Sequence, residues 1–419
     1  MPAERWLARV VAVRPEEVRA LLWSFAYFFC LLAAYYILRP LRDEMGVAGG
    51  VRNLQWLFTA TFVTMLAAVP CYGFLVARLP RRRFIPFVYH FFVANLAIFW
   101  ALLALGVERA TVARVFFVWI SVFNLFAVSV FWSFMADIYR SEQAKRLYGF
   151  IAAGGTAGSL AGPAITIGLA QVLGAANLII VAALLLEAAV LCVTRLEPRH
   201  EAAPEARVGG GALDGLAMVL RSPYIAGILL WVAFLSIAAT FLYFEQAQIV
   251  ADTSSDPAVR TRIFATADLA VGVLTLALQF VATGKLIERF GVGPALSLVP
   301  LVFVGGFALL AATPVLAVVI GFQALQRTAN FAISNPAREV LFTVLARDEK
   351  YKAKNVIDTV GVRGADAVGG WLVTGLRALG MEARSLAVSA IALAVASLAL
   401  SLALGRAHGR RAAAASVRA

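Results

Sequence analysis

Residues 20–45 read ALLWSFAYFFCLLAAYYILRPLRDEM, and this stretch decides the fold class. Residues 20–38 contain no charged side chain, and the first charge is Arg39. A hydrocarbon core about 30 Å thick is crossed by a helix of about 20 predominantly apolar residues. The stretch therefore predicts a transmembrane helix, and one long enough to carry Arg39 within the membrane before it ends.

Similar apolar runs recur along the whole chain. Its 419 residues are 62% hydrophobic with a mean hydropathy of +0.84, whereas soluble domains are roughly 45–50% apolar. We expect an all-α integral membrane fold of about twelve transmembrane helices in two six-helix halves, major-facilitator-like. The predicted spans are 20–45, 54–76, 84–106, 112–136, 147–171, 174–194, 224–247, 262–286, 292–311, 313–334, 355–378 and 384–404.

Composition also restricts the classes of function. No nucleophile–base pair, metal-ligand cluster or large soluble domain is visible, so we expect a transporter rather than an enzyme, with no catalytic residue, metal or cofactor. The formal net charge is +13, but the basic residues lie in connectors between apolar runs. That is where topology signals belong, so we expect lipid rather than nucleic acid as the partner.

The basic residues predict the orientation. If both termini are cytoplasmic, 26 of the 37 Lys and Arg residues lie on the inner side and nine on the outer side. Short cytoplasmic loops carry such an excess. We therefore expect a multi-pass protein of the bacterial inner membrane with both termini in the cytoplasm.

The hydrophilic stretch 196–222, with its prolines, charges and Gly209–Gly211, predicts a cytoplasmic linker. It separates an N-terminal half at 20–195 from a C-terminal half at 223–405. Residues 1–19 read as an amphipathic segment lying on the membrane surface, and residues 406–419 as a basic tail.

The halves share short motifs. Gly-x-Leu-x-x-Arg occurs at 73–78 and at 284–289, and Ala-Lys occurs at 144–145 and at 353–354. The two offsets are nearly equal, which indicates parallel repeats related by an axis along the membrane normal, as in major-facilitator transporters. We expect the halves to superpose by a two-fold rotation, in a monomer.

The end of the first span is its most informative part. Arg39 and Asp43 are four residues apart and can pair on one helical face, while Arg42 adds positive charge. In one interpretation these are solvated charges of an ordinary outer loop. In the other they line a cavity, where the planar guanidinium fork suits phosphate or carboxylate.

The tenth and eleventh spans also contain ionisable groups. Asp358, Arg363 and Asp366 interrupt the eleventh, and Arg327 and Asn330 lie in the tenth. A charge at the bilayer centre costs about 2.5–3.5 kcal/mol on insertion scales, so each needs a partner or a wet cavity. Arg363 and Asp366 are three apart and can neutralise each other, so they either brace helices or bind substrate.

Single acids in other spans are candidates for coupling. Glu187 lies in the sixth span and Asp268 in the eighth, and each is a proton carrier or a partner for these arginines. The Gly-rich run 154–159 lacks the Lys-Ser/Thr of a phosphate loop. Its small residues Gly154, Gly158 and Gly162 predict close helix packing instead.

Several of these segments together resemble the nucleotide transporter family of ATP/ADP exchangers. Leu38-Arg39-Pro40-Leu41-Arg42-Asp43 is similar to that family's Leu-Arg-x-Leu-Lys-Asp element, with Arg42 in place of Lys. Residues 131–137 with 144–148 resemble its Phe-Trp-x-Phe-Ala-Asn and Ala-Lys-x-x-Tyr segments, and 354–364 resembles its eleventh helix. The fourth span departs from the family, because Arg114 is its only charge where the family carries an acid.

The resemblance implies alternating-access exchange of an anionic, phosphorylated solute such as a nucleotide. The residues expected to bind it are Arg39, Arg42, Arg327, Asn330, Asp358, Arg363 and Asp366. The alternative is a proton-coupled major-facilitator carrier of an organic acid, drug or other small solute, with Glu187 or Asp268 carrying the proton.

Overall fold

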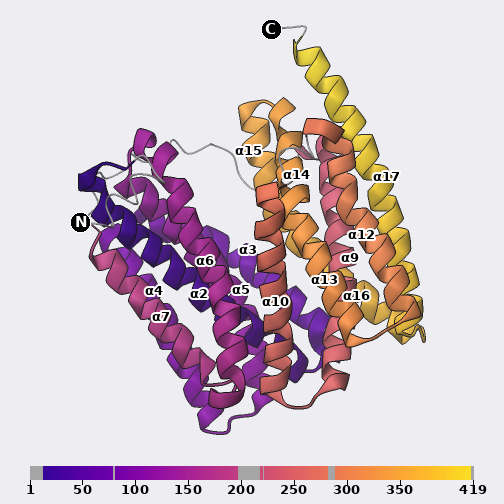
Figure 1. Cartoon of the computed structure of the whole chain (residues 1–419). Helices are drawn as coiled ribbons and strands as arrows, with labels where there is room; N and C mark the ends of the chain where they lie inside the picture. Colours follow the sequence, from indigo (N-terminus) through magenta and orange to yellow (C-terminus); the bar gives the residue numbers. More distant parts are fainter. Residues whose placement is uncertain (1–12, 79–80, 197–217, 220, 282–287, 417–419) are drawn as a thin grey trace. The chain divides into compact units, whose positions relative to one another are not determined.

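The computed structural model describes residues 13–78, 81–196, 218–219, 221–281 and 288–416 (Figure 1). Within these ranges the chain is helical and contains no strand. Ten described helices are long and apolar enough to cross a membrane by length and composition, and α7 (Leu178–Thr194) is a shorter apolar helix. With the interrupted segment from Arg347 to Ala378, these make up the twelve predicted segments, and the predicted fold class is confirmed.

The chain forms two compact units, and each includes a short segment from the other half of the sequence. Unit 1 comprises Met1–Gly49, Ala67–Ala206 and Asp256–Leu269, and unit 2 comprises Gly50–Leu66, Arg207–Ser255 and Ala270–Ala419. The start of α10 thus belongs to unit 1, and the start of α3 belongs to unit 2. The division into halves at 20–195 and 223–405 stays a prediction.

Unit 1 is organised around its first long helix, α2. This helix packs against α5, α6 and α7, while α4 packs against α5 and α7. Stacked aromatic rings fill the interior, for example Phe28 on Phe131 with centroids 4.0 Å apart. The helices of unit 1 are α2 Val18–Ala48, part of α3 Leu54–Arg78, α4 Arg81–Ala104, α5 Arg109–Ile138, α6 Ser141–Leu173, α7 and the start of α10 Pro257–Val281, with a short turn η1 at Pro15–Glu17.

The glycines of α6 allow it to approach α2 closely, as the sequence predicted. A Cβ on Gly154 would lie 2.5 Å from the Phe25 carbonyl oxygen, and one on Gly162 would lie 2.8 Å from the Ala33 carbonyl oxygen. Between them, a Cβ on Gly158 would overlap the carbonyl oxygen of Phe29. Backbone atoms cannot rotate away, so this stripe fixes the contact between the two helices.

Replacing Gly158 with alanine should therefore destabilise the protein by about 1–3 kcal/mol, because the methyl group overpacks a backbone contact. A maleimide dye that fluoresces on reaction with thiols, including the buried Cys192, reports thermal unfolding of the purified protein. Gly168→Ala is the matched control, since a Cβ at Gly168 of the same helix meets nothing within 4 Å. Equal melting temperatures for the two variants would refute this account of the interface.

Unit 2 is built from the later helices. Its α9 packs against α16 and α17, and α12 packs against α17 and α13. A Cβ on Gly369 of α16 would lie 3.2 Å from the Ile237 Cα of α9, so glycine contacts serve both α2–α6 and α9–α16. The elements are η2 Val51–Asn53, the start of α3, α9 Pro223–Thr253, the rest of α10, α12 Val292–Ala312, α13 Leu316–Ala329, η3 Asn330–Ser334, α14 Asn335–Leu341, η4 Phe342–Val344, α15 Arg347–Val356, η5 Ile357–Gly361, α16 Val362–Ala378 and α17 Ala383–Ser416.

The tenth and eleventh segments are interrupted by single π-helical turns, η3 and η5. Pro336 lies two residues after the end of η3, and its ring displaces the carbonyl four residues earlier, that of Ala332, which accounts for the wider turn there. The sequence predicted uninterrupted spans at 313–334 and 355–378. The π-turns begin at Asn330 and Ile357, so they include two of the predicted binding residues, Asn330 and Asp358.

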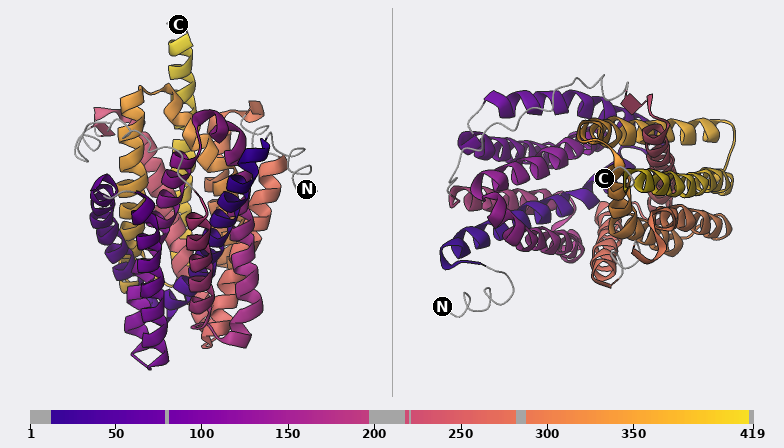
Figure 2. Two further views of the ribbon diagram at one scale, coloured as in Figure 1. Left: turned by 90° about the vertical axis from the view of Figure 1, so that its left-hand side faces the viewer. Right: turned by 90° about the horizontal axis from the view of Figure 1, so that it is seen from above.

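The last helix is longer than the predicted span 384–404. α17 continues through the basic residues to Ser416, and Figure 2 shows its end projecting beyond the other helices of unit 2. Arg411 lies 4.6 Å from the ring centroid of Tyr224, which anchors this extension to α9. Three predicted features lie wholly or largely outside the described residues: the amphipathic segment 1–19, the linker 196–222 and the second Gly-x-Leu-x-x-Arg motif.

Candidate functional site

Arg39 and Arg42 lie within α2, which continues through Pro40 to Ala48. Each side chain is 19% exposed. The interpretation of this segment as an ordinary solvated loop is therefore wrong. Pro40 lacks the N–H that would bond the Tyr36 carbonyl, so the helix continues there with one hydrogen bond fewer.

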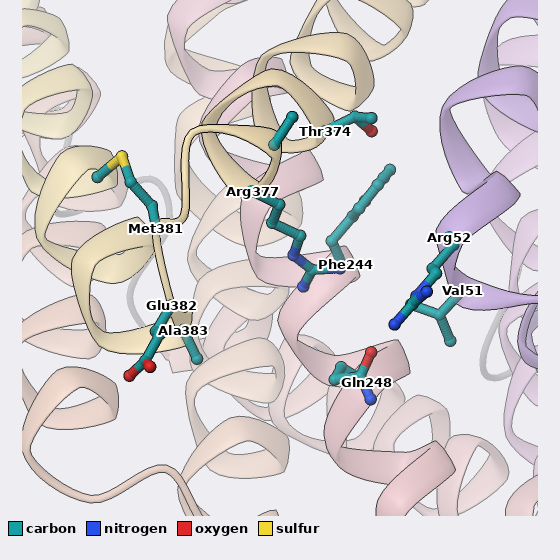
Figure 3. Close-up of a pocket in the computed structure, with 10 residues that line it drawn as sticks. Val51, Arg52, Phe244, Gln248, Thr374, Arg377, Met381, Glu382 and Ala383 are labelled. Atoms are coloured by element: carbon teal, nitrogen blue, oxygen red, sulfur yellow. The ribbon is translucent and has the colours of Figure 1, made fainter.

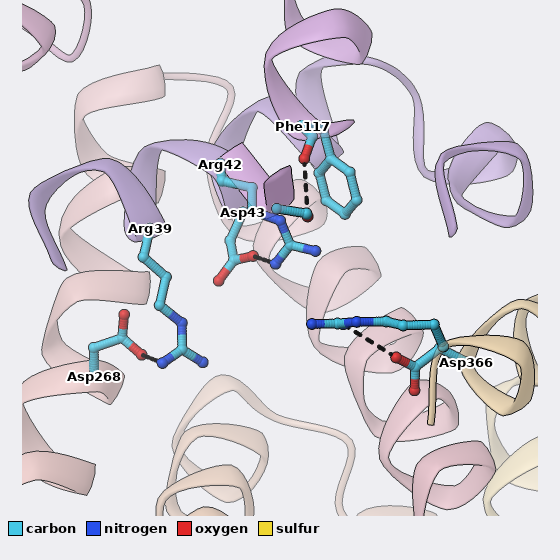
Figure 4. Close-up of polar contacts among 8 residues, drawn as sticks. Arg39, Arg42, Asp43, Phe117, Asp268 and Asp366 are labelled. Carbon is cyan, nitrogen blue, oxygen red and sulfur yellow. Dashed lines mark hydrogen bonds and ion pairs between the residues drawn. The ribbon is translucent and has the colours of Figure 1, made fainter. Parts of the chain in front are cut away.

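Arg39 forms its ion pair with the start of α10. Its Nη1 lies 3.7 Å from Oδ1 of Asp268, whose side chain is 2% exposed (Figure 4). The predicted pairing of Arg39 with Asp43 is wrong, because Asp43 pairs with Arg42 and the Arg39 side chain reaches another helix. Asp268 was predicted as a partner for the arginines, and the structure pairs it with one.

Arg42 is held by a carboxylate and an aromatic ring. Its Nη1 donates to Oδ1 of Asp43 at 3.2 Å, and its guanidinium lies 4.0 Å from the ring centroid of Phe117 on α5. Its Nε is buried and has no hydrogen-bond acceptor among the described residues. The stacking fixes the plane of the guanidinium, and the buried Nε–H is left without an acceptor in the described chain.

Glu44, the residue after Asp43 in α2, is a charged residue that the sequence analysis did not predict as part of the site. Its side chain is fully buried, and Oε2 accepts from Arg109 of α5 at 2.9 Å. Oε1 lies 4.0 Å from Nη1 of Arg260 on α10. Glu44 therefore joins three helices of unit 1, and one of them comes from the second half of the sequence.

Exchanging the charges of Arg39 and Asp268 tests whether their pair holds α2 to α10. Arg39→Asp and Asp268→Arg should each destabilise the protein, because each places two like charges together. The double variant should recover about 0.5–3 kcal/mol relative to the sum of the single changes. The readout is the unfolding midpoint of the purified proteins, and strict additivity would contradict direct pairing.

The second charged cluster lies in unit 2, around the π-turns. Arg338 of α14 pairs with Asp358 of η5 at 3.1 Å, and beside them Lys354 pairs with Glu339 at 2.8 Å. Salt bridges of this kind connect the tenth and eleventh segments at their wider turns. π-Turns are frequent at functional sites, which agrees with the selection of Asp358 from the sequence.

The other predicted residues of unit 2 lie on the same segments. Arg363 and Asp366 of α16 form the predicted pair, with Nη1 and Oδ2 3.4 Å apart. Arg327 is buried near the end of α13, with its guanidinium 6.0 Å from the ring centroid of Phe331. Asn330 begins η3 one turn later.

Two acids differ from the sequence-based expectation. Glu187 lies 3.5 Å from His90 rather than beside an arginine, and its side chain is 41% exposed, whereas that of Asp268 is 2% exposed. Glu245 of α9 was not singled out, yet it is 4% exposed and accepts from Arg377 of α16 at 3.2 Å. Glu245 ends an uncharged run that begins at residue 223, which is the same sequence signal that marks Asp268.

The Major Facilitator Superfamily model matches residues 20–346. The chain belongs to the Major Facilitator Superfamily. This membership places it among multi-pass membrane transporters of small solutes rather than among enzymes. No curated protein matches the chain significantly.

Solved structures of major-facilitator-type transporters share the fold. A bacterial homologue of the human lysosomal transporter Spinster, solved facing inward, is 14% identical with a TM-score of 0.63, over 95% of this chain and 99% of that one. The nucleoside transporter NupG is 13% identical with a TM-score of 0.65, over 93% and 98%. A bacterial homologue of the iron transporter ferroportin is 11% identical with a TM-score of 0.66, over 94% and 100%. At these identities the likeness shows the fold alone.

Proposed function

We propose that this transporter carries an anionic, phosphorylated solute such as a nucleotide, by alternating-access exchange across the bacterial inner membrane with both termini in the cytoplasm. The observation that carries the proposal is the state of Arg42. Arg42 occupies the position where the ATP/ADP exchangers have lysine. Its guanidinium contacts the ring of Phe117 and the carboxylate of Asp43, and its buried Nε lacks an acceptor in the described chain. A phosphate oxygen is a suitable acceptor for such a donor.

The second cluster supports the same class of solute. Arg327, Arg338 and Arg363 lie on adjoining segments of unit 2, with Asp358 and Asp366 balancing part of their charge. A nucleotide brings several negative charges and a large desolvation cost into the membrane, and guanidinium groups offset that cost. Asn330 and the acids would then orient the base or sugar, as amides and carboxylates do elsewhere.

The ion pairs of α2 with α10 suit alternating access. Arg39 with Asp268, and Glu44 with Arg260, join helices from the two halves of the sequence at the same end of unit 1. Alternating access rocks one repeat against the other, so contacts of this kind must break in one state and form again in the next. A charged solute reaching Arg39 would compete with Asp268 for the guanidinium.

A binding assay tests the proposed solute class. Radiolabelled ATP is incubated with the purified, immobilised protein, and unlabelled ATP, ADP, AMP, adenosine, phosphate and organic acids compete. We expect displacement to weaken in the order ATP, ADP, AMP, with adenosine nearly inactive. Equal displacement by adenosine and ATP, or none by any nucleotide, would contradict the proposal.

The alternative is a proton-coupled carrier of an organic acid, drug or other small solute. The nearly complete burial of Asp268 beside Arg39 favours it, since ionisable side chains inside the membrane commonly mark ion pathways and proton relays. Uptake into proteoliposomes without internal substrate, driven only by an inward proton gradient and abolished in Asp268→Asn, would favour this alternative over exchange.

A further inference from the structure

A cavity outside both charged clusters lies at one end of unit 2. It has a volume of about 590 Å³ and is formed where α9 and α16 end and α17 begins, with η2 opposite (Figure 3). Because α17 runs from this point to the other end of the unit, the cavity lies far from the described C-terminal end. In the predicted topology it opens on the outer side of the membrane. Its volume is within the range that binds small ligands, about 300–1,000 Å³.

Two arginines supply the positive charge of this cavity. Figure 3 shows the guanidinium groups of Arg52 and Arg377 directed toward the space between η2 and α16. Arg377 is positioned by its ion pair with the buried Glu245 at 3.2 Å. Arg52 is exposed, and no carboxylate of the described chain lies within ion-pair distance of it. An anion in the cavity would therefore meet one fixed and one uncompensated guanidinium.

The lining also contains hydrogen-bond acceptors. Gln248 donates its amide hydrogen to Asp252 at 2.9 Å, which leaves its carbonyl oxygen for the cavity. Figure 3 shows that oxygen facing the arginines. Glu382 adds a carboxylate to the lining, and Phe244 and Met381 contribute apolar surface. Two guanidinium groups beside a carbonyl acceptor and an apolar wall suit a ligand that is both anionic and a hydrogen-bond donor.

We propose that this cavity binds a phosphate group that carries an ammonium or hydroxyl group nearby, as in ethanolamine phosphate. Arg52 and Arg377 take the phosphate, and the Gln248 carbonyl takes the donor. Phosphate is favoured over carboxylate because two guanidinium groups from different helices need more oxygen atoms than one carboxylate offers. The ligand is either a free solute or the headgroup of a lipid.

Calorimetric titration of O-phosphoethanolamine into the protein in maltoside detergent tests the site. We expect saturable binding that Arg52→Gln weakens at least about tenfold, the effect of losing one charge-assisted contact. Phosphocholine, whose quaternary ammonium has no N–H, should bind more weakly. Arg384→Gln is the control, because this exposed arginine adjoins the lining without belonging to it.

Testing Arg377 requires a variant that does not leave the buried carboxylate of Glu245 without its partner. Arg377→Gln alone would leave Glu245 unpaired, so the double variant Glu245→Gln/Arg377→Gln is used, and it should also lose binding. Absence of saturable binding in the wild-type protein, or unchanged binding in Arg52→Gln, overturns the proposal. Saturable phosphoethanolamine binding that Arg52→Gln weakens would keep this site whatever nucleotide counterflow shows, so the two proposals are tested separately.

The source of the phosphate is decided in nanodiscs. If a lipid headgroup is the natural occupant, discs of phosphatidylethanolamine should block the soluble probe while discs of phosphatidylcholine should not. If both kinds of disc bind the probe equally, the ligand is a free solute. Either result agrees with a cavity that binds a phosphate group with a nearby donor, whereas loss of binding in both kinds of disc counts against the site.

Discussion

Replacing Glu44 with glutamine should lower the free energy of unfolding by about 3–5 kcal/mol, because it breaks a buried ion pair by removing one partner. Glu44 is fully buried, and its carboxylate offsets both Arg109 at 2.9 Å and Arg260 at 4.0 Å. Without it, two guanidinium groups at one site have no common counter-charge. The thiol-reactive dye used for Gly158→Ala reports the change as a lower unfolding temperature.

The control for Glu44 is Glu108→Gln. Glu108 is an exposed glutamate beside the same end of α5, and its carboxylate bonds only to the nearby Thr111 hydroxyl among the interactions seen. Its loss should cost no more than about 1 kcal/mol. If Glu44→Gln and Glu108→Gln have the same unfolding temperature, the contacts of Glu44 with three helices do not stabilise unit 1 as the geometry indicates.

Replacing Arg42 with glutamine should weaken the apparent affinity for ATP by about 10- to 100-fold. One charge-assisted hydrogen bond contributes about 1.5–3 kcal/mol, and the loss should be larger for ATP than for AMP. Arg42→Lys should be milder, because lysine keeps the charge and is the residue of the resembling family at this position. Concentration dependence of labelled nucleotide uptake into proteoliposomes gives the affinities.

Two further variants separate substrate binding from damage to α2. Arg42→Gln/Asp43→Asn restores the local charge balance, so it should recover stability but keep the weak affinity for ATP. Arg262→Gln removes an arginine of α10 at the same predicted side of the membrane and should leave the affinity unchanged. An ATP affinity restored in the double variant would assign Arg42 a structural role only.

The sequence is sufficient to predict the helices but not the partners of their charges. Apolar length predicts α2 directly, and spacing predicts both the Gly154–Gly162 stripe and the Arg363–Asp366 pair, because these features depend on one helix period. Arg39 could equally reach along its own helix or across to another. Arg39 pairs with Asp268 because α10 packs beside α2, and the spacing of residues along one helix does not encode that packing.

Glu245 and the two π-turns were not predicted, for two different reasons. Glu245 carries the same signal as Asp268, an acid within an apolar run. The π-turn η5 has no such signal in the sequence, since a wider turn without a proline arises from the balance of hydrogen bonding and packing along the helix. Pro336 indicated a break near residue 332 but not its form.

Counterflow tests the central claim most directly. Proteoliposomes are loaded with unlabelled ADP, and uptake of external labelled ATP is followed with no other gradient. The account predicts transient accumulation of ATP that requires internal nucleotide and is strongly reduced in Arg42→Gln but not in Arg262→Gln. No uptake of nucleotide with or without internal ADP, alongside proton-driven uptake of an unrelated solute, would contradict it.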